Sequence, residues 1–236
     1  MLAMRKKKIK VLVTGACGFI GSHLVDELVR RKFEVIAIDN LSTGKRINLN
    51  PKARFYRRDI TRLSQIKNLF REVEFVFHAA ALARIQPSIL DPRKTFQVNC
   101  TGTLNVLIAS RAARVKKFIY SASSSVYGDQ PRLPLKENMV PQPKNIYALS
   151  KLMGEEMCKV FSSLYKLDTI SLRYFNVYGP RQLYTGAYAT VIGIFLNQLS
   201  NGRPLTITGD GSIKRDFTYI SDVVRANILA IRSKKT

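Results

Sequence analysis

The 236 residues are 46% hydrophobic, which is enough for one domain with a sizeable core and some further surface for a ligand. Lys and Arg total 39 against 16 Asp and Glu, and the resulting net charge of +23 favours anionic partners; because the basic residues are scattered and form no zinc-finger or RNA-recognition signature, we expect no specific nucleic-acid partner. Three dispersed cysteines, two histidines and the lack of any long apolar stretch argue against a disulfide framework, a metal site and a membrane span, so a cytoplasmic protein is expected.

Short β-branched runs alternate with longer segments of helical period along most of the chain. This alternation is typical of a parallel sheet with helices on both faces, in which each helix leads into the next strand. Strands are predicted at Lys10–Thr14, Glu34–Asp39, Arg54–Tyr56, Phe75–His78, Lys117–Ser121 and Thr169–Tyr174. Helices are predicted at Ile20–Arg31, Thr61–Phe70, Pro92–Arg114 and Ile146–Tyr165. Residues 1–174 are therefore predicted to form a doubly wound α/β domain.

The alternation weakens after Tyr174. A helix is predicted near Thr190–Asn201, a strand at Leu205–Thr208, and a last helix that begins at Ser221 and Asp222. Residues 175–236 are thus expected to form a second, smaller lobe across the carboxyl ends of the strands, which is the edge where α/β sheets bind ligands.

A glycine-rich turn joins the first strand to the first helix. Gly15, Gly18 and Gly21 would let the backbone approach a pyrophosphate closely, and the free N–H groups of the helix start would bind its negative charge. The sequence therefore predicts a dinucleotide site at this turn.

Asp39 ends the next strand, where a carboxylate could accept hydrogen bonds from the adenosine ribose. Its charge would repel a 2′-phosphate, so NAD is favoured over NADP. Two alternatives remain open: Asp39 can be a turn residue before Asn40, and Lys45 and Arg46 keep NADP as a minor option.

Tyr147 and Lys151 lie four residues apart at the start of a predicted helix and so share one face. The ammonium is expected to lower the pKa of the phenol, and a nicotinamide cation would lower it further, which gives a tyrosinate able to remove a hydroxyl proton. Ser123, at the end of the fifth strand, could donate to a sugar oxygen beside Tyr147. These residues are the predicted catalytic group.

Together these features resemble the extended short-chain dehydrogenase/reductase family, the NAD-dependent sugar-nucleotide epimerases and dehydratases, and within it the UDP-glucose 4-epimerases. The resemblance covers essentially the whole chain and implies a Rossmann sheet. It is carried by the glycine turn, Asp59-Ile60, His78–Ala81, Asn99 with Thr101–Thr103, the group Ser123, Tyr147 and Lys151, Arg173–Pro180, and Arg215–Phe217.

The resemblance also implies roles for individual residues. The implied NAD-binding residues are Gly15, Gly18, Phe19, Ile20, Gly21, Asp39, Asn40, Ser42, Thr43, Gly44, Asp59, Ile60, Ala79, Ala80, Ala81, Asn99, Ser121, Tyr147, Lys151, Tyr174 and Phe175. The implied substrate-binding residues are Ser123, Ser124, Tyr147, Asn176, Ala189, Val191 and Arg215. Asn176 can instead be a turn former, Arg215 a solvated surface charge, and Ser124 a loop hydroxyl.

Dehydratases of this family usually carry an acid just after the catalytic hydroxyl residue, where this chain has Ser124 and Ser125. The resemblance therefore favours epimerisation at carbon 4 of a UDP-hexose, through a transient 4-keto sugar and a tightly bound NAD. UDP-N-acetylhexosamine and UDP-glucuronate remain open as substrates. An NADPH-linked sugar-nucleotide reductase and a non-catalytic NAD-binding sensor or scaffold remain open as functions.

The resemblance has two further implications. Relatives continue beyond the equivalent of Thr236 and supply a second phosphate-binding arginine, so the substrate lobe is expected to be truncated. Relatives also dimerise through helices equivalent to Pro92–Arg114 and Ile146–Tyr165, whose apolar residues exceed one stripe; a homodimer is expected, with a broad core face as the alternative.

Overall fold

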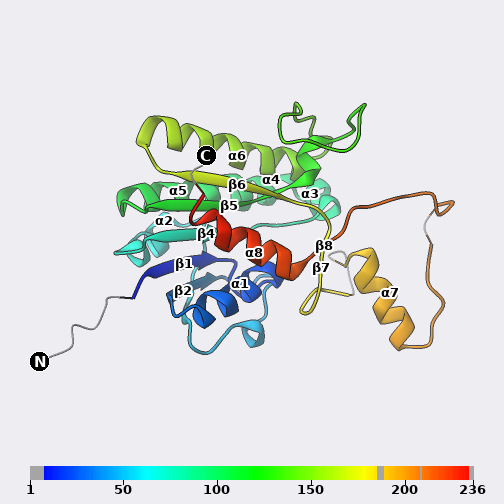
Figure 1. Cartoon of the computed structure of the whole chain (residues 1–236), viewed down its shortest axis with the longest axis horizontal. Coiled ribbons are helices and arrows are strands. Elements are labelled where there is room, and N and C mark those ends of the chain that lie inside the picture. The colour runs from blue at the N-terminus through cyan, green and yellow to red at the C-terminus, as the bar shows by residue number, and fades with distance from the viewer. Residues whose placement is uncertain (1–7, 185–188, 208, 234–236) are drawn as a thin grey trace, which may run out of the picture.

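A six-stranded parallel sheet forms the centre of the computed structural model, which describes residues 8–184, 189–207 and 209–233 (Figure 1). Its strand order is β3-β2-β1-β4-β5-β6. The strands are β1 (Lys10–Thr14), β2 (Glu34–Asp39), β3 (Arg54–Arg57), β4 (Phe75–His78), β5 (Lys117–Ser123) and β6 (Thr169–Tyr174). The predicted doubly wound Rossmann sheet is confirmed. Because the order reverses between β1 and β4, the connections that follow these two strands run to opposite faces of the sheet and leave room for a ligand at their carboxyl ends.

Four of the predicted strands have the observed bounds, whereas β3 and β5 run further than predicted. β5 pairs with β6 as far as Ser123 opposite Tyr174. Ser123 is thus held by the sheet itself, and the loop begins one residue later, in the 3-10 turn η4 (Ser124–Tyr127).

The strands alternate their side chains between two cores. Val11 and Val13 of β1 pack with Leu24 of α1 (Phe19–Arg30), while Leu12 between them packs with Leu107 on the other face. All are buried, and each such side chain stabilises the fold by about 2 kcal/mol relative to exposure. The two faces therefore require helices on both sides.

One face carries α1 and α8 (Ile220–Ala230), which pack together, and the other carries α5 (Thr103–Ala112) and α6 (Ile146–Tyr165) with the short α2 (Leu63–Ile66) and the 3-10 turn η2 (Lys67–Phe70). A further 3-10 turn, η1 (Arg46–Asn48), follows β2. The prediction for α6 is exact, because Asn145 caps its start by accepting from the Ala148 N–H at 2.9 Å and Lys166 ends it in the left-handed conformation.

The predicted helix Pro92–Arg114 is not continuous. It consists of α4 (Pro92–Phe96), the π-helical turn η3 (Gln97–Gly102) and α5, and an unpredicted helix, α3 (Ile85–Leu90), precedes it. The amide of Asn99 in η3 accepts from the Leu82 N–H at 2.8 Å and donates to the Leu82 carbonyl at 3.1 Å. The π-helical turn interrupts the α-helix and places the Asn99 amide against the backbone of Leu82, so that Asn99 clamps the segment after β4.

A buried chain of hydrogen bonds ties this clamp to the sheet. The Thr14 hydroxyl donates to His78 Nδ1 at 2.7 Å, His78 Nε2 donates to the Thr103 hydroxyl at 2.8 Å, and Thr103 donates to the Asn99 carbonyl at 2.6 Å. Burial lowers the pKa of His78 to about 3, so the imidazole stays neutral and can both accept and donate.

The second lobe is small in the described part of the chain. It holds α7 (Val191–Ser200) and a parallel pair formed by β7 (Val177–Tyr178) and β8 (Thr218–Tyr219), and Figure 1 shows α7 standing away from the sheet. The predicted strand Leu205–Thr208 is wrong over Leu205–Ile207, where the chain has no regular secondary structure and no strand partner, and Ile207 is 68% exposed. Thr208 lies outside the described residues. A β-branched run without a neighbouring strand does not form a ladder.

The division of the chain at residue 174 stays a prediction. The last helix, α8, starts at Ile220, one residue earlier than predicted, and returns to the main sheet to pack on α1. In the part of the chain that the structure describes, no helix has the length and apolarity needed to cross a membrane.

Candidate active site

A cavity of about 1600 Å³ runs along the carboxyl ends of the strands, from the glycine turn to α7. Most of the predicted site residues line it. These are Gly15, Gly18, Phe19, Ile20, Gly21, Asp39, Asn40, Ser42, Thr43, Asp59, Ile60, Ala79, Ala80, Ala81, Ser121, Ser123, Ser124, Tyr147, Lys151, Tyr174, Asn176 and Arg215. The sequence therefore brought into one cavity residues that lie as much as 200 positions apart.

Five predicted residues lie outside the cavity lining: Gly44, Asn99, Phe175, Ala189 and Val191. Asn99 acts behind the wall as the clamp on Leu82. The Phe175 ring packs against the Tyr127 ring, with centroids 6.2 Å apart. In α7 the residues that line the cavity are Ile192, Gly193, Leu196, Asn197 and Ser200. Direct ligand contact by these five residues stays a prediction.

The glycine turn fits a pyrophosphate. Gly15 has φ +67°, and a Cβ there would lie 2.7 Å from the Ala80 nitrogen, while a Cβ on Gly21 would lie 2.1 Å from the Gly15 carbonyl oxygen. Only glycine permits this close approach of β1, α1 and the end of β4. No described side chain caps the start of α1 and its first turn holds no acid, so its N–H groups are available to an anion.

Asp39 both organises the turn after β2 and lines the cavity. Its carboxylate accepts from the Cys17 N–H at 2.9 Å and from the Leu41 N–H at 2.7 Å. The two predicted readings of Asp39 are thus compatible, because each carboxylate oxygen has a further lone pair for a ribose hydroxyl.

Lys151 is a buried cation in the cavity lining. Its ammonium donates to the Ser121 carbonyl at 2.7 Å and lies 4.8 Å from the centre of the Tyr120 ring, and the residue is only 4% exposed. Burial lowers the pKa of Lys151 to about 8, opposed by the nearby Glu155 carboxylate.

Tyr147 lies one helical turn before Lys151 and is partly exposed to the cavity. Burial raises the pKa of its phenol, and a hydrogen bond with the Ser123 side chain and the charge of Arg84 act in the opposite direction. The predicted lowering of this pKa by Lys151 is therefore wrong for the protein alone, because burial dominates and the ammonium is engaged with the β5 carbonyl.

The start of α6 is fixed from several sides. The Tyr147 N–H donates to the Ser88 hydroxyl of α3 at 3.2 Å, and the Ser150 hydroxyl donates to the Tyr147 carbonyl at 2.7 Å. Asn99 in turn donates to the Ser150 hydroxyl at 3.0 Å. The clamp in η3 thus also positions the helix that carries the phenol.

Ser123 is fixed by its own turn. Its hydroxyl oxygen accepts from the Ser125 N–H at 3.2 Å and from the Ser125 hydroxyl at 2.9 Å. Those contacts leave the Ser123 proton free for the phenol or for a bound oxygen.

Asn176 and Arg215 line the far end of the cavity but have local roles as well. Asn176 has φ +30°, and its amide donates to the Asp216 carbonyl at 2.8 Å, which joins the segment after β6 to the segment before β8. Arg215 is exposed and donates to the Lys214 carbonyl at 2.7 Å. Substrate binding by either residue stays a prediction.

Sequence reasoning missed two contributors to the site. Arg84 lines the cavity near Tyr147 from the residue that precedes α3, and no motif marked it because α3 itself was not predicted. Asn227 of α8 donates to the Tyr174 hydroxyl at 2.7 Å, which lies 3.4 Å from the Ser121 hydroxyl. Only the return of α8 to the sheet could reveal this contact.

Residues 11–236 match the family model of the NAD dependent epimerase/dehydratase family. The chain belongs to this family. It is 39% identical over 230 residues to the UDP-glucose 4-epimerase of Mycolicibacterium smegmatis, covering 94% of this chain and 73% of that protein.

Solved structures agree. A UDP-N-acetylglucosamine 4-epimerase from Methanobrevibacter ruminantium, in complex with UDP-N-acetylmuramic acid, superposes with a TM-score of 0.94 at 40% identity over 98% of this chain and 75% of its own. The UDP-glucose 4-epimerase of Thermotoga maritima with UDP-glucose gives 0.92 at 40% identity over 94% and 73%.

The depressed pKa of Lys151 predicts a pH dependence of stability. A base whose folded pKa of about 8 lies below its ordinary 10.5 is deprotonated first in the folded chain, so the free energy of unfolding gains a contribution as pH rises through this window. Between pH 8 and 10 this contribution amounts to about 2 kcal/mol. Urea unfolding of the chain and of Lys151→Met, without added ligand, should show that rise only in the unchanged chain; parallel profiles would contradict it.

Proposed function

We propose that this protein interconverts a UDP-hexose and its carbon-4 epimer with NAD held in the cavity. The observation that carries the proposal is the placement of Ser123, Tyr147 and Lys151 in one cavity with the glycine turn. The sequence identity of about two fifths to 4-epimerases of known structure supports it.

Each member of the group has a role that its surroundings support. NAD, when bound, supplies a hydride acceptor that returns the hydride within the same cycle. Tyr147 takes the proton of the sugar 4-hydroxyl and gives a proton back when the ketone is reduced on its other face. Ser123 steadies the phenol and the sugar oxygen by hydrogen bonds, and Lys151, whose ammonium is held in the cavity lining by the Ser121 carbonyl, binds the nicotinamide end of NAD beside the phenol.

The rest of the cavity supports the placement of the two ligands. The start of α1 is suited to the pyrophosphate of NAD, and Asp39 and Asp59 line the part of the cavity suited to its adenosine. Asn176 and Arg215, at the far end, are proposed to bind the diphosphate of the UDP-sugar.

Tyr147→Phe tests the catalytic assignment. Loss of the phenol should lower the rate of UDP-glucose and UDP-galactose interconversion by about a hundredfold or more, while NAD released from the purified protein remains detectable by mass spectrometry. If the unchanged chain and the variant both bind NAD and neither turns over any UDP-sugar tested, the protein is an NAD-binding sensor rather than an epimerase.

A sugar acid is a second candidate substrate. Of the described residues that line the cavity, Asp39 and Asp59 are the only acids, whereas Tyr147 shares the lining with Arg84 and the hydroxyl residues Ser123 to Ser125, and both Ser123 and the charge of Arg84 act on its phenol. This end of the cavity is thus suited to a carboxylate on the sugar, and one similar structure holds UDP-N-acetylmuramic acid.

Arg84→Gln distinguishes the two substrates. If the guanidinium binds a carboxylate, the variant should lose about tenfold or more in kcat/KM for UDP-glucuronate relative to UDP-glucose. The ratio is the measure, because any effect of Arg84 on the Tyr147 pKa acts on both substrates. Arg132→Gln, on an exposed loop, is the control. An unchanged ratio removes the sugar-acid assignment.

We also propose a cytoplasmic homodimer. All three cysteines are free, which suits a reducing compartment. Packed together, α5 and α6 expose a set of apolar side chains that a second copy could cover: Leu104, Ile108, Leu149, Met153, Val160 and Leu164.

Met153→Glu tests the dimer. A carboxylate in the centre of an apolar interface is costly to bury, so the variant should be monomeric at concentrations at which the unchanged chain is dimeric by light scattering. A monomeric unchanged chain would contradict this part of the proposal.

A further inference from the structure

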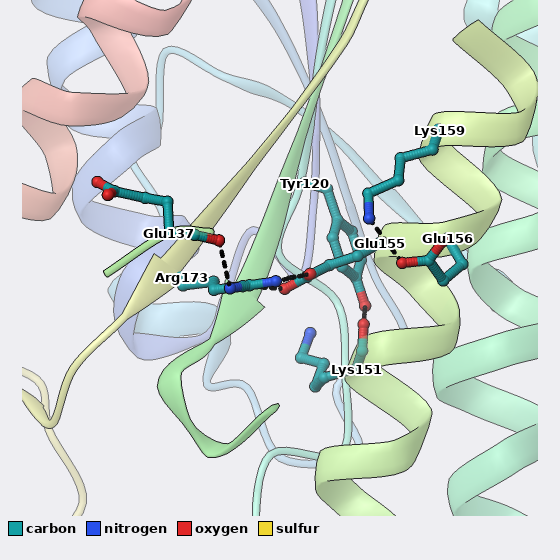
Figure 2. Close-up of polar contacts among 7 residues, drawn as sticks. All are labelled: Tyr120, Glu137, Lys151, Glu155, Glu156, Lys159 and Arg173. Atoms are coloured by element: carbon teal, nitrogen blue, oxygen red, sulfur yellow. Dashed lines mark hydrogen bonds and ion pairs between the residues drawn. The ribbon is translucent and has the colours of Figure 1, made fainter. Parts of the chain in front are cut away.

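An ion pair between a buried glutamate and a largely covered arginine links the catalytic helix α6 to β6. Glu155 is 2% exposed, and Arg173 of β6 donates to both of its carboxylate oxygens, from Nε at 3.0 and 3.2 Å and from Nη2 at 2.8 Å. Figure 2 shows Glu155 pointing from α6 to Arg173, with Lys151 one turn earlier on the same helix. Tyr147, Lys151 and Glu155 follow one another at intervals of four residues and so form one stripe of α6.

Arg173 joins this stripe to the turn that carries Ser123. Its guanidinium lies 4.6 Å from the centre of the Tyr127 ring, and Tyr127 ends η4, which begins directly after Ser123. Arg173 also donates to the Glu137 carbonyl at 3.5 Å. One side chain therefore contacts α6, η4 and the loop between them.

We propose that Glu155 and Arg173 are positioning residues for catalysis: the pair holds the Ser123 turn in register with Tyr147 and Lys151, and it fixes a carboxylate one helical turn from the Lys151 ammonium. The inference rests on the proposed function for its effect on rate, but its effect on Lys151 can be measured without any substrate.

The cost of burying two charges supports a role beyond stability. Desolvation removes much of what a buried ion pair gains, and apolar side chains of similar volume often stabilise a fold as well. An ion pair in the third turn of the catalytic helix is therefore explained better by the geometry and charge that it imposes on its neighbours.

Several titratable groups lie near Lys151, and their charge states decide which of them can stabilise its ammonium. His78 of β4 is neutral, since its pKa is lowered by burial and by Lys151, and burial raises the pKa values of Tyr120, Cys100 and Cys158. Burial also raises that of Tyr147. Glu155 is thus the carboxylate that supports the ammonium, and it is the first of the groups that raise the Lys151 pKa.

The experiment compares three variants of the full chain. Glu155→Gln with Arg173→Gln removes both charges together, so no lone charge is left buried; Arg173→Lys keeps both charges but loses the planar fork. Glu156→Gln is the control, because Glu156 pairs with Lys159 at 2.7 Å on the exposed side of the same helix.

In the double variant, the rise in unfolding stability that begins near pH 8 should begin about one unit lower, and the alkaline limb of kcat should move by the same amount. In Arg173→Lys, the pH at which unfolding stability begins to rise and the alkaline limb of kcat should both be unchanged. The value of kcat should fall about tenfold or more, with KM changed little. Glu156→Gln should change none of these.

An unshifted rise in the double variant, or the same shift in Glu156→Gln, overturns the proposal. Unchanged kcat in Arg173→Lys also overturns it, and this variant decides the question if the double variant does not fold. Where no UDP-sugar is turned over at all, the proposed function fails, and the unfolding profile still tests the charge on Lys151.

Discussion

The site depends on a single buried cation. An ammonium taken out of water is costly, and Lys151 recovers part of that cost from the Ser121 carbonyl, the face of the Tyr120 ring and the Glu155 carboxylate. Two of these partners, Ser121 and Tyr120, belong to β5. The contacts of Lys151 with them fix the position of α6 along the strand and its rotation about its own axis. Tyr147, one turn nearer the end of the sheet, is thereby delivered to the cavity beside Ser123.

The sequence predicts well whatever depends on local periodicity. The continuous apolar run of Val11, Leu12 and Val13 is typical of a buried parallel strand, and the interval between Tyr147 and Lys151 marked a shared helix face, because both patterns follow from local backbone geometry. The break at Asn99 could not be predicted, since that π-helical turn satisfies the Leu82 backbone, which lies 17 residues away in the sequence. The raised pKa of Tyr147 was missed for the same reason, because the burial that raises it depends on the tertiary fold.

In the second lobe, too, tertiary contacts decide whether a locally favourable sequence forms the predicted element. Leu205 to Ile207 have the composition of a strand, but a ladder needs a partner, and the described residues provide none there. The last helix, by contrast, is linked to Lys151 indirectly, through a chain of hydrogen bonds. Asn227 of α8 donates to the Tyr174 hydroxyl, and this hydroxyl contacts the Ser121 side chain. The Ser121 carbonyl in turn accepts from the Lys151 ammonium. Residues after the sheet therefore support the catalytic helix through the strand ends.

The position of the acidic residues in the cavity can orient anionic ligands, which the overall excess of basic residues cannot do by itself. Both carboxylates of the described lining, Asp39 and Asp59, belong to the end suited to adenosine, whereas Arg84, Lys151 and Arg215 line the part proposed for the sugar nucleotide. A chain of net charge +23 attracts anions over its whole surface, and that attraction alone cannot orient them. The cavity has bases at both ends, since Lys45 and Arg58 line it near Asp39 and Asp59, but the acids of its described lining lie only at the end suited to adenosine. A dinucleotide whose diphosphate meets the start of α1 therefore leaves to a second diphosphate the end at which no described acid lines the cavity. The uneven placement of acidic side chains along the cavity, rather than the total charge of the chain, thus favours two anionic ligands that lie end to end and meet at the phenol of Tyr147.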